Sequence, residues 1–242
     1  MRVVFYTTAA IGYNLPMSAT PEVDFRDLFD HFHAPTTKVD CGLECMVHNP
    51  HRKPFCCDIC HAVPVAYRSE WEYLRENTRL WHKWRGNECV DEPTNPMELL
   101  NQTPHHLFLL ACKGPAFCER EYRSTSCRQF PFFPYITSDF RFIGLVYDWE
   151  FTDKCWVLSH LDQVTGAYRQ EFIQTYDRLF SIWLEDLDSY ALLSEETRDH
   201  YAAKNRRFSL LHRNGKWYLV SPKSEKIRRI DPSTLKSFPP YT

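Results

Sequence analysis

Glycine is scarce in this chain of 242 residues, which contains only 7. None of them completes a GxGxxG, GxxxxGKS or GxxxxGKT pattern, so the sequence argues against a nucleotide site built on a glycine turn. The chain also lacks an apolar run of roughly 18 residues, the length that a membrane-spanning helix needs. The N-terminal apolar run is short and contains Tyr6, Thr7 and Thr8, which argues against a secretory signal. We therefore expect a cytoplasmic protein without a membrane partner.

An excess of charge of either sign is absent as well. The 29 lysine and arginine residues face 31 aspartate and glutamate residues, which leaves a net charge of −2. Because no global basic field exists, we do not expect nucleic acid as a partner. The charge is uneven, however, since the segment from Lys204 to Arg229 holds nine basic residues and a single acid, Glu225. This segment is either a solvated basic face or a surface for a polyanion or a protein partner.

Cysteine is abundant, with 10 residues, and nine of them are candidate metal ligands in two groups. The first group is Cys41, Cys45, Cys56, Cys57 and Cys60, and the second is Cys112, Cys118 and Cys127, followed by Cys155. Deprotonated thiols are ligands for zinc, for iron and for iron–sulfur clusters. The sequence therefore predicts a zinc or iron–sulfur centre, and the thiolate ligands leave the choice between them open. Cys89 lies alone between the groups, and we expect it not to be a ligand.

Disulfides are the main alternative use of these cysteines. Cysteine makes up about 4% of the chain, well below the roughly 8–10% of small disulfide scaffolds. A chain of this length with 43% hydrophobic residues can also bury a core without covalent cross-links. Thiols stay reduced in the cytoplasm, so we expect free thiols.

Other residues of the first group offer further alternatives. His48, His51 and His61 can each replace a thiolate as a ligand. Cys57 and Cys60 form a CxxC pair, which in thioredoxin-like proteins follows a buried strand. No apolar strand precedes this pair, so the sequence does not favour thiol–disulfide exchange.

The first two thirds of the chain show two helical patterns and a hairpin. Apolar residues recur at helical spacing over residues 22–32, and a second helix is expected from Ser69, where Ser69 and Glu72 match a capping box. Residues 90–104 read as a surface connection. Aromatic and β-branched runs over residues 130–136 and 140–147 predict a hairpin, whose return should bring Cys155 toward Cys127.

The last third is free of cysteine and has its own apolar patterns. An amphipathic helix is expected from Tyr168 to Leu193, and Ser194 can cap another helix. Asn214 and Gly215 form the Asn-Gly pair typical of a type I′ hairpin turn.

The stretch Cys118-Glu-Arg-Glu-Tyr-Arg-Ser-Thr-Ser-Cys-Arg-Gln-Phe-Pro131 resembles the signature of the YkgJ-type cysteine-cluster family, which comprises zinc- or iron-chelating domain proteins. In that family an arginine follows a cysteine by five residues, and a Cys-Arg-x-Phe-Pro sequence begins four residues after that arginine. Cys112 also matches, as do Cys56 and Cys57 upstream, whereas Ser124 stands where the family usually has proline. The resemblance covers residues 41–155 and implies a metal centre. The flagellin lysine methylases resemble the family in their cysteine pattern, which implies an enzyme as an alternative.

Two arginines in this stretch are candidates for contact with the metal centre. Four thiolates leave a divalent metal or a 4Fe–4S cube with a net negative charge. Arg123 and Arg128 can offset that charge and donate hydrogen bonds to sulfur. The alternative is a surface salt bridge to Glu119 or Glu121.

These observations predict an α-rich α+β protein with short β-hairpins, a single domain organised around a cysteine-ligated metal centre. Residues 1–165 would form the metal-binding part, and residues 166–242 a helical segment with a C-terminal hairpin packed on it. The expected function is metal binding with a structural, redox-sensing or metal-handling role. The alternatives are a zinc- or iron–sulfur-dependent enzyme that modifies a protein or peptide, and a zinc-built interaction module that uses the basic C-terminal third. Nine candidate thiols exceed the four that one site requires, so the sequence allows two sites and leaves their number open.

Overall fold

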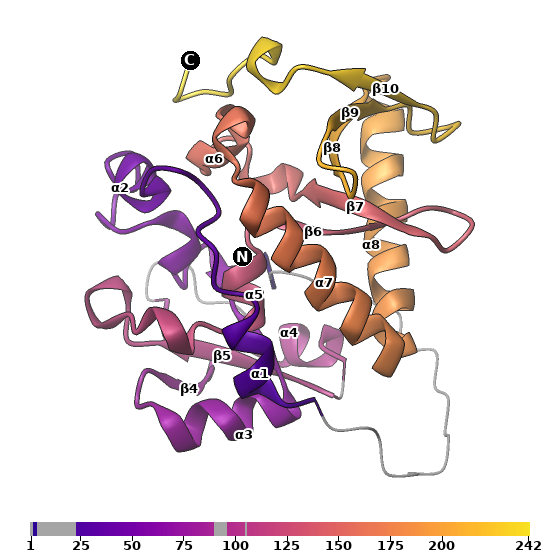
Figure 1. Ribbon diagram of the computed structural model, residues 1–242. Helices are drawn as coiled ribbons and strands as arrows, with labels where there is room; N and C mark the ends of the chain where they lie inside the picture. The colour runs from indigo at the N-terminus through magenta and orange to yellow at the C-terminus, as the bar shows by residue number, and fades with distance from the viewer. Residues whose placement is uncertain (1, 4–22, 90–95, 105) are drawn as a thin grey trace.

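A computed structural model describes residues 2–3, 23–89, 96–104 and 106–242 (Figure 1). The protein combines α-helices with mainly antiparallel sheets, so the α+β class is confirmed. The helices are α1 Phe25–Asp30, α2 Cys41–Met46, α3 Arg68–Asn77, α4 Pro96–Gln102, α5 Thr125–Gln129, α6 Trp156–Ser159, α7 Gly166–Ile182 and α8 Leu184–Ala203. The strands are β1 Arg2–Val3, β2 Ala62–Val63, β3 Val65–Tyr67, β4 Trp81–Lys83, β5 Leu107–Cys112, β6 Phe132–Ile136, β7 Phe142–Tyr147, β8 Phe208–His212, β9 Trp217–Val220 and β10 Ile227–Ile230.

The largest sheet has five strands in the order β10-β9-β8-β7-β6. The predicted hairpin over residues 130–147 is confirmed as β6 and β7, which pair antiparallel. Strand β7 then pairs with β8, so strands from both sides of residue 165 share this sheet. Gly144 permits this pairing, because a Cβ atom there would lie 2.3 Å from the Leu211 carbonyl oxygen.

Two long helices, α7 and α8, pack against each other and lie beside this sheet (Figure 1). The prediction of a single helix from Tyr168 to Leu193 is wrong, because the helix is interrupted at Trp183, which has an extended backbone. The Trp183 ring stacks on Tyr67 with 4.5 Å between centroids, a tertiary contact that helical periodicity does not encode. Ser194 lies inside α8 instead of capping a helix, and its hydroxyl accepts a hydrogen bond from the backbone N–H of Ile136 at 2.9 Å.

The predicted hairpin at Asn214 and Gly215 is confirmed as β8 and β9, but its turn differs from the expected one. Gly215 has φ of +83°, whereas Asn214 does not have the positive φ that a type I′ turn requires. The His212 N–H donates to the Lys216 carbonyl at 3.0 Å, which closes a three-residue loop with Gly215 in the left-handed position.

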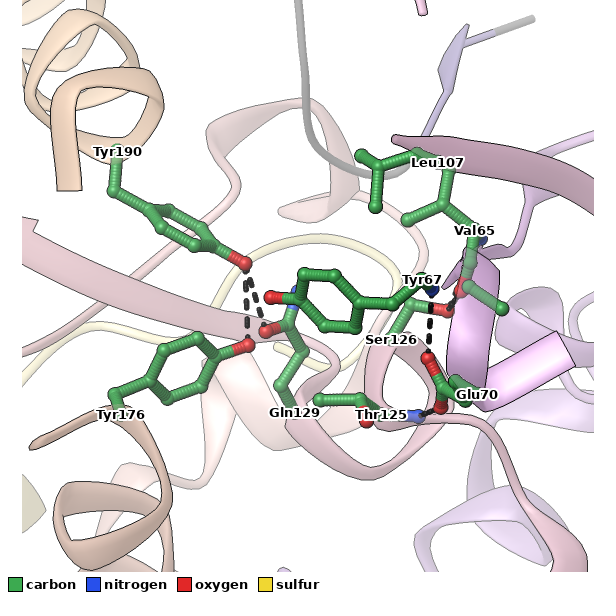
Figure 2. A pocket seen from close by; sticks show the side chains of 10 residues that line it. Val65, Tyr67, Glu70, Leu107, Thr125, Ser126, Gln129, Tyr176 and Tyr190 are labelled. Atoms are coloured by element: carbon green, nitrogen blue, oxygen red, sulfur yellow. Dashed lines mark hydrogen bonds between the residues drawn. The ribbon is translucent and has the colours of Figure 1, made fainter. Parts of the chain in front are cut away.

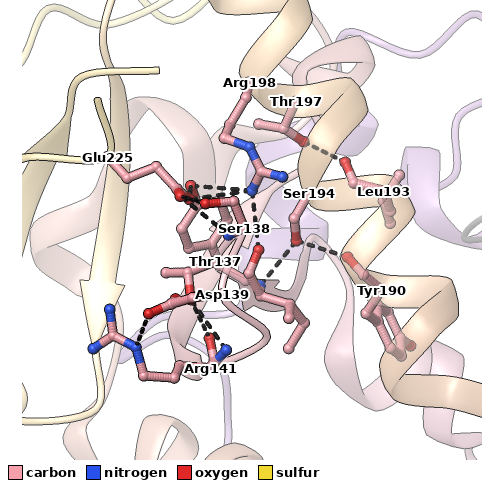
Figure 3. Close-up of polar contacts among 12 residues, drawn as sticks. Thr137, Ser138, Asp139, Arg141, Tyr190, Leu193, Ser194, Thr197, Arg198 and Glu225 are labelled. Atoms are coloured by element: carbon pink, nitrogen blue, oxygen red, sulfur yellow. Dashed lines mark hydrogen bonds and ion pairs between the residues drawn. The ribbon is translucent and has the colours of Figure 1, made fainter. Parts of the chain in front are cut away.

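The acid of the basic segment, Glu225, turns toward the protein instead of solvent (Figure 3). Its carboxylate accepts hydrogen bonds from the Tyr135 hydroxyl at 2.7 Å and from the Ser138 backbone at 3.0 Å, and it pairs with Arg198 at 3.2 Å. The basic residues Lys223, Lys226, Arg228 and Arg229 remain exposed around it. Because its one acid is turned inward, the exposed surface of this segment carries a larger excess of positive charge than its residue composition indicates.

A three-stranded sheet, in the order β3-β5-β4, lies at the other end of the molecule with α3 (Figure 1). Helix α3 begins one residue earlier than expected, and its cap uses Glu70, whose carboxylate accepts the Tyr67 N–H at 3.0 Å. The predicted surface connection over residues 90–104 contains α4, while residues 90–95 lie outside the described part of the chain. Among the described helices, none combines the length and the apolar character needed to cross a membrane.

Candidate metal centre

The first set of cysteines gathers where α2 packs against α6 (Figure 1). Cys41 and Cys45 are four residues apart on α2, which places both thiols on one face of the helix. Cys155 is the N-cap residue of α6 and is buried. Burial and the nearby thiols of Cys41 and Cys45 raise the pKa of Cys155 well above its usual value. Cys155, more than 100 positions away along the chain, therefore joins Cys41 and Cys45 in one group.

The C-terminal residues cover this group. The Tyr241 hydroxyl donates a hydrogen bond to the Lys154 carbonyl at 2.6 Å, and the Tyr241 ring meets the His48 ring edge-on at 5.0 Å. Burial and the neighbouring Cys45 and Cys155 raise the pKa of Tyr241, which places its hydroxyl close to these thiols. The end of the basic third therefore shields the cysteines from solvent.

The second set of cysteines comes from β5, α5 and the segment between them. Cys112 ends β5, Cys118 follows a short 3-10 turn over Pro115–Phe117, and Cys127 lies on α5. Burial, with the thiols of Cys112 and Cys57 nearby, raises the pKa of Cys127 to about 12. Burial, Cys57 and Cys118 likewise raise the pKa of Cys112. Cys57 therefore lies near the second set, although the sequence places it in the first and it also acts on Cys45 there.

Cys56 and Cys57 are adjacent on the 3-10 turn Phe55–Cys57 and separate the two sets. The hydrogen bond between their sulfurs raises the pKa of Cys56, the donor, and lowers the pKa of Cys57, the acceptor. Cys56 also lies close to Cys41 and Cys45, whose charges raise its pKa further. Eight cysteines are free. Cys41, Cys45, Cys56 and Cys155 act on one another as one set of four, and Cys57, Cys112, Cys118 and Cys127 as another, while Cys57 also acts on Cys45 and so links the two sets.

The position of Cys155 differs from the expectation that it would join Cys127. After β7 the chain turns through the 3-10 segment Trp149–Phe151, and the Cys155 N–H donates to the Phe151 carbonyl at 2.7 Å. This turn directs Cys155 toward α2 instead of α5. A hairpin pattern in the sequence predicts that the chain reverses direction, but it does not predict which element the following residues will pack against.

Cys60 and Cys89 form a disulfide, which corrects two expectations. Cys60 was a candidate ligand and Cys89 an isolated thiol, yet in this structure neither sulfur is free to act as a thiolate. Two carboxylates shape the turns that bring them together. Asp58 accepts the Cys60 N–H at 3.2 Å, and Glu88 accepts the N–H groups of Arg85 and Gly86, each at 2.8 Å. The partners are 29 residues apart, so spacing alone contained no signal of the pair.

Arg123 lies between the two sets of thiols. Its Nε donates a hydrogen bond to the Cys118 sulfur at 3.3 Å. Burial disfavours its charge, but Cys118, Cys127 and Cys57 outweigh burial and hold the pKa of Arg123 above its usual value. Its charge also acts on Cys41 in the other set. Arg123 therefore has the contact with sulfur that was expected of it.

Arg128 is buried but contacts backbone carbonyls instead of sulfur. It donates to the carbonyls of Arg123 at 2.8 Å and Glu121 at 2.6 Å, and it also donates to those of Phe29 and Phe32 on the α1 side. Its guanidinium lies 4.1 Å from the centre of the Phe29 ring. Burial lowers the pKa of Arg128 to about 10. Arg128 therefore holds the loop that carries Arg123 against α1.

The spacing of the thiols bears on the kind of metal they suit. Four sulfurs around one zinc, with Zn–S bonds of about 2.3 Å, lie about 3.8 Å from one another. Within the described residues, no three of the eight free thiols lie within 4.8 Å of one another. An iron–sulfur cube holds its four thiolates on separate irons and so farther apart. The donor set is all sulfur, and its spacing is wider than that around a single zinc ion.

The three candidate histidines contact residues other than the eight thiols. His51 and His61 lie around Asp58, with His51 Nδ1 2.7 Å and His61 Nε2 3.9 Å from the same carboxylate oxygen. His48 contacts Tyr241.

A small polar cavity lies beside α5, and sequence reasoning did not detect it (Figure 2). Its volume is about 10 Å³, roughly the space of one water molecule. Burial raises the pKa of Glu70 in its wall to about 7, although the carboxylate accepts the Thr125 N–H at 2.5 Å. Because Thr125 begins α5, Glu70 fixes the helix that carries Cys127. The one available signal was Glu70 itself, an acid at the start of a helix.

Comparisons of the chain with protein-family models, with curated proteins and with solved structures found no match. The resemblance to the YkgJ-type family therefore stays a prediction.

Proposed function

We propose that this chain is an iron–sulfur protein of the cytoplasm that binds two clusters, one on each set of four cysteines. The observation that carries the proposal is the convergence of eight free thiols from six separate elements between residues 41 and 155. Each set supplies the four thiolates that one 4Fe–4S cube requires. In this view the metal also organises the α-rich cysteine-bearing part of the fold, as the sequence predicted.

The electrostatic environment of the thiols favours a bound cluster over a buried group of protonated, metal-free thiols. Burial raises the pKa of Cys45 to about 11 and that of Cys127 to about 12, so without metal these thiols hold their protons. A metal displaces the protons and forms bonds that offset the cost of burying charge. Arg123, which contacts Cys118, supplies a positive charge and a hydrogen-bond donor to the resulting anionic centre.

A redox role follows from the place of Arg123 and from the closeness of the two sets. Hydrogen bonds to sulfur and nearby positive charge tune the reduction potential of iron–sulfur clusters. Cys56 and Cys57 are neighbours in the chain and belong to different sets, so two clusters bound there would be close enough to exchange electrons. The water-sized cavity beside Glu70 is too small for a substrate, so it does not support the enzymatic alternative.

Anaerobic purification followed by metal and sulfide analysis tests the proposal. We expect about eight iron atoms and eight sulfides per chain, the content of two cubes, with visible absorption that bleaches in air or on reduction. About two zinc ions without sulfide would replace this proposal by a structural zinc centre. A metal-free protein with its eight cysteines paired as disulfides would overturn it.

A further inference from the structure

A second group of metal-ligating side chains surrounds Asp58, outside the eight-thiol centre. The Asp58 side chain is fully buried. Its Oδ2 accepts hydrogen bonds from Asn49 at 3.0 Å and from His51 Nδ1 at 2.7 Å. Its Oδ1 pairs with Lys53 at 3.1 Å and accepts the Cys60 N–H at 3.2 Å. Such a density of partners keeps a charged carboxylate in a fixed position inside the protein.

Three of these side chains have the spacing of a metal site. The ligand atoms of His51, Asp58 and Cys60 all lie within 4.8 Å of one another. Tetrahedral zinc with nitrogen, oxygen and sulfur ligands needs about 3.3–3.6 Å between them, so movements of about an ångström would close the site. His61 Nε2 lies 3.9 Å from Asp58 Oδ2 and can supply the fourth ligand. The set of two imidazoles, one carboxylate and one thiolate suits zinc.

The surroundings provide both support and access. Lys53 and the Cys60 N–H hold Oδ1, which leaves Oδ2 to face the histidines, and Asn49 orients that oxygen. Partners of this kind beyond the ligands fix metal sites in proteins. The side chains of His51 and His61 are 33% and 27% exposed, so an ion can enter between them.

The disulfide decides whether this set is complete. In the structure Cys60 is bonded to Cys89, and its sulfur is therefore not a thiolate. We propose that reduction of the Cys60–Cys89 disulfide turns His51, Asp58, Cys60 and His61 into a zinc site, so that oxidation and zinc compete for Cys60. In the reductive step a dithiol gives two electrons and two protons to the sulfur pair and becomes a disulfide itself. Zinc then displaces the proton of the Cys60 thiol.

Two matched variants of the full chain test the proposal. Cys89→Ser and Cys60→Ser both remove the disulfide, but only Cys89→Ser retains the Cys60 thiol. Both retain the eight cysteines of the proposed iron–sulfur centre, so metal bound there cancels in the comparison. Cobalt(II), whose absorption reports thiolate ligation and tetrahedral geometry, is titrated anaerobically into each variant. We expect Cys89→Ser to bind one more cobalt ion than Cys60→Ser and to release it to zinc.

Further variants and the wild-type protein complete the test. Adding His51→Ala to Cys89→Ser should remove the extra cobalt ion. Wild-type protein should lack the extra site when oxidised and gain it after treatment with a dithiol that is removed before titration, which provides the same comparison if a variant fails to fold. Equal cobalt uptake by the two variants, or by oxidised and reduced wild type, would overturn the proposal. Iron content measured in the same samples reports separately on the eight-thiol centre.

Discussion

The region around the eight thiols and the region from residue 166 onward are built in different ways. The helices that carry the cysteines are short, with 6 residues in α2, 5 in α5 and 4 in α6. In the C-terminal region α7 has 17 residues and α8 has 20, and both pack beside a five-stranded sheet. Helices shorter than about 12–15 residues are marginal by themselves, so the cysteine region needs other bonds to hold its shape. In the proposed function, metal–thiolate bonds would supply this stabilisation.

The aromatic residues show the same contrast. In the C-terminal region a continuous series of buried rings joins Tyr168, Phe172, Tyr176 and Tyr190. The cysteine region also buries apolar side chains, such as Phe29 and Phe55, but it adds two buried ionic groups close to its cysteines, Arg128 and Asp58. Apolar packing stabilises a region without any ligand, whereas buried polar groups specify positions at little net gain in stability. We therefore expect the two regions to respond differently when metal is removed.

Chelation should have the largest effect. Binding at a thiolate site contributes on the order of 10 kcal/mol, comparable to the stability of a whole domain. After metal removal under reducing conditions, amide hydrogen exchange should rise strongly in α2, α5 and α6 while α7 and α8 keep most of their protection. Equal increases along the whole chain would show a single cooperative unit and remove the contrast between the regions.

Serine variants of the cysteines sharpen the division into two sets. Cys127→Ser and Cys155→Ser should each lose about half of the bound iron, because each removes one ligand from a different set of four. Cys89→Ser is the matched control and should keep nearly all of the iron, since Cys89 belongs to neither set. Iron analysis of the three purified variants decides the matter. If Cys155→Ser and Cys127→Ser removed the same cluster, the division into sets would be wrong.

Arg128 tests whether polar contacts hold the cysteine region. Arg128→Met removes the donor that ties together four backbone carbonyls, of which that of Phe29 keeps a hydrogen bond from the Phe32 N–H. We expect a loss of about 3 kcal/mol in the free energy of unfolding, measured by denaturant titration. Arg141→Met, at an exposed arginine of the β6–β7 turn, is the control and should change stability by less than about 0.5 kcal/mol. Similar losses of unfolding free energy in both variants would show that Arg128 contributes no more to stability than an exposed arginine does.

Glu70 should give a smaller, pH-dependent effect at the boundary of the two regions, where its cavity also touches Tyr176 and Tyr190. Its folded pKa of about 7 lies above the ordinary value of 4.5, so the folded state binds this proton more tightly than the unfolded state. The contribution to stability is complete below pH 4.5, and it falls as pH rises toward 7, by up to about 3 kcal/mol.

Glu70→Gln isolates this contribution, because glutamine has no proton to lose. The difference in unfolding free energy between wild type and Glu70→Gln should change between pH 4.5 and 7 and stay constant above that range. Subtracting one curve from the other removes the pH dependence of the thiols, which both proteins share. A constant difference across the range would show that Glu70 is ionised in the folded protein.

Local patterns in the sequence predicted much of the secondary structure. The helix at residues 22–32, the hairpin of β6 and β7, and the hairpin at Gly215 are all present, because periodicity and turn residues report on neighbours in the chain. The break at Trp183 was missed, since its cause is a ring contact with Tyr67, 116 positions away. The type of turn at Asn214 was missed for a similar reason, because β7 and β9 both constrain β8.

For the candidate site, the sequence by itself determined the chemistry: ten thiols, two arginines near them, and too little glycine for a common nucleotide motif. Only the tertiary structure decided which thiols are neighbours. It placed Cys155 with Cys41, brought Cys57 near Cys127 as well as Cys45, and paired Cys60 with Cys89. The physical reason is that ligand and disulfide partners are chosen by distance in space. That distance depends on how α2, α5 and α6 pack, and the spacing of cysteines along the chain does not contain it.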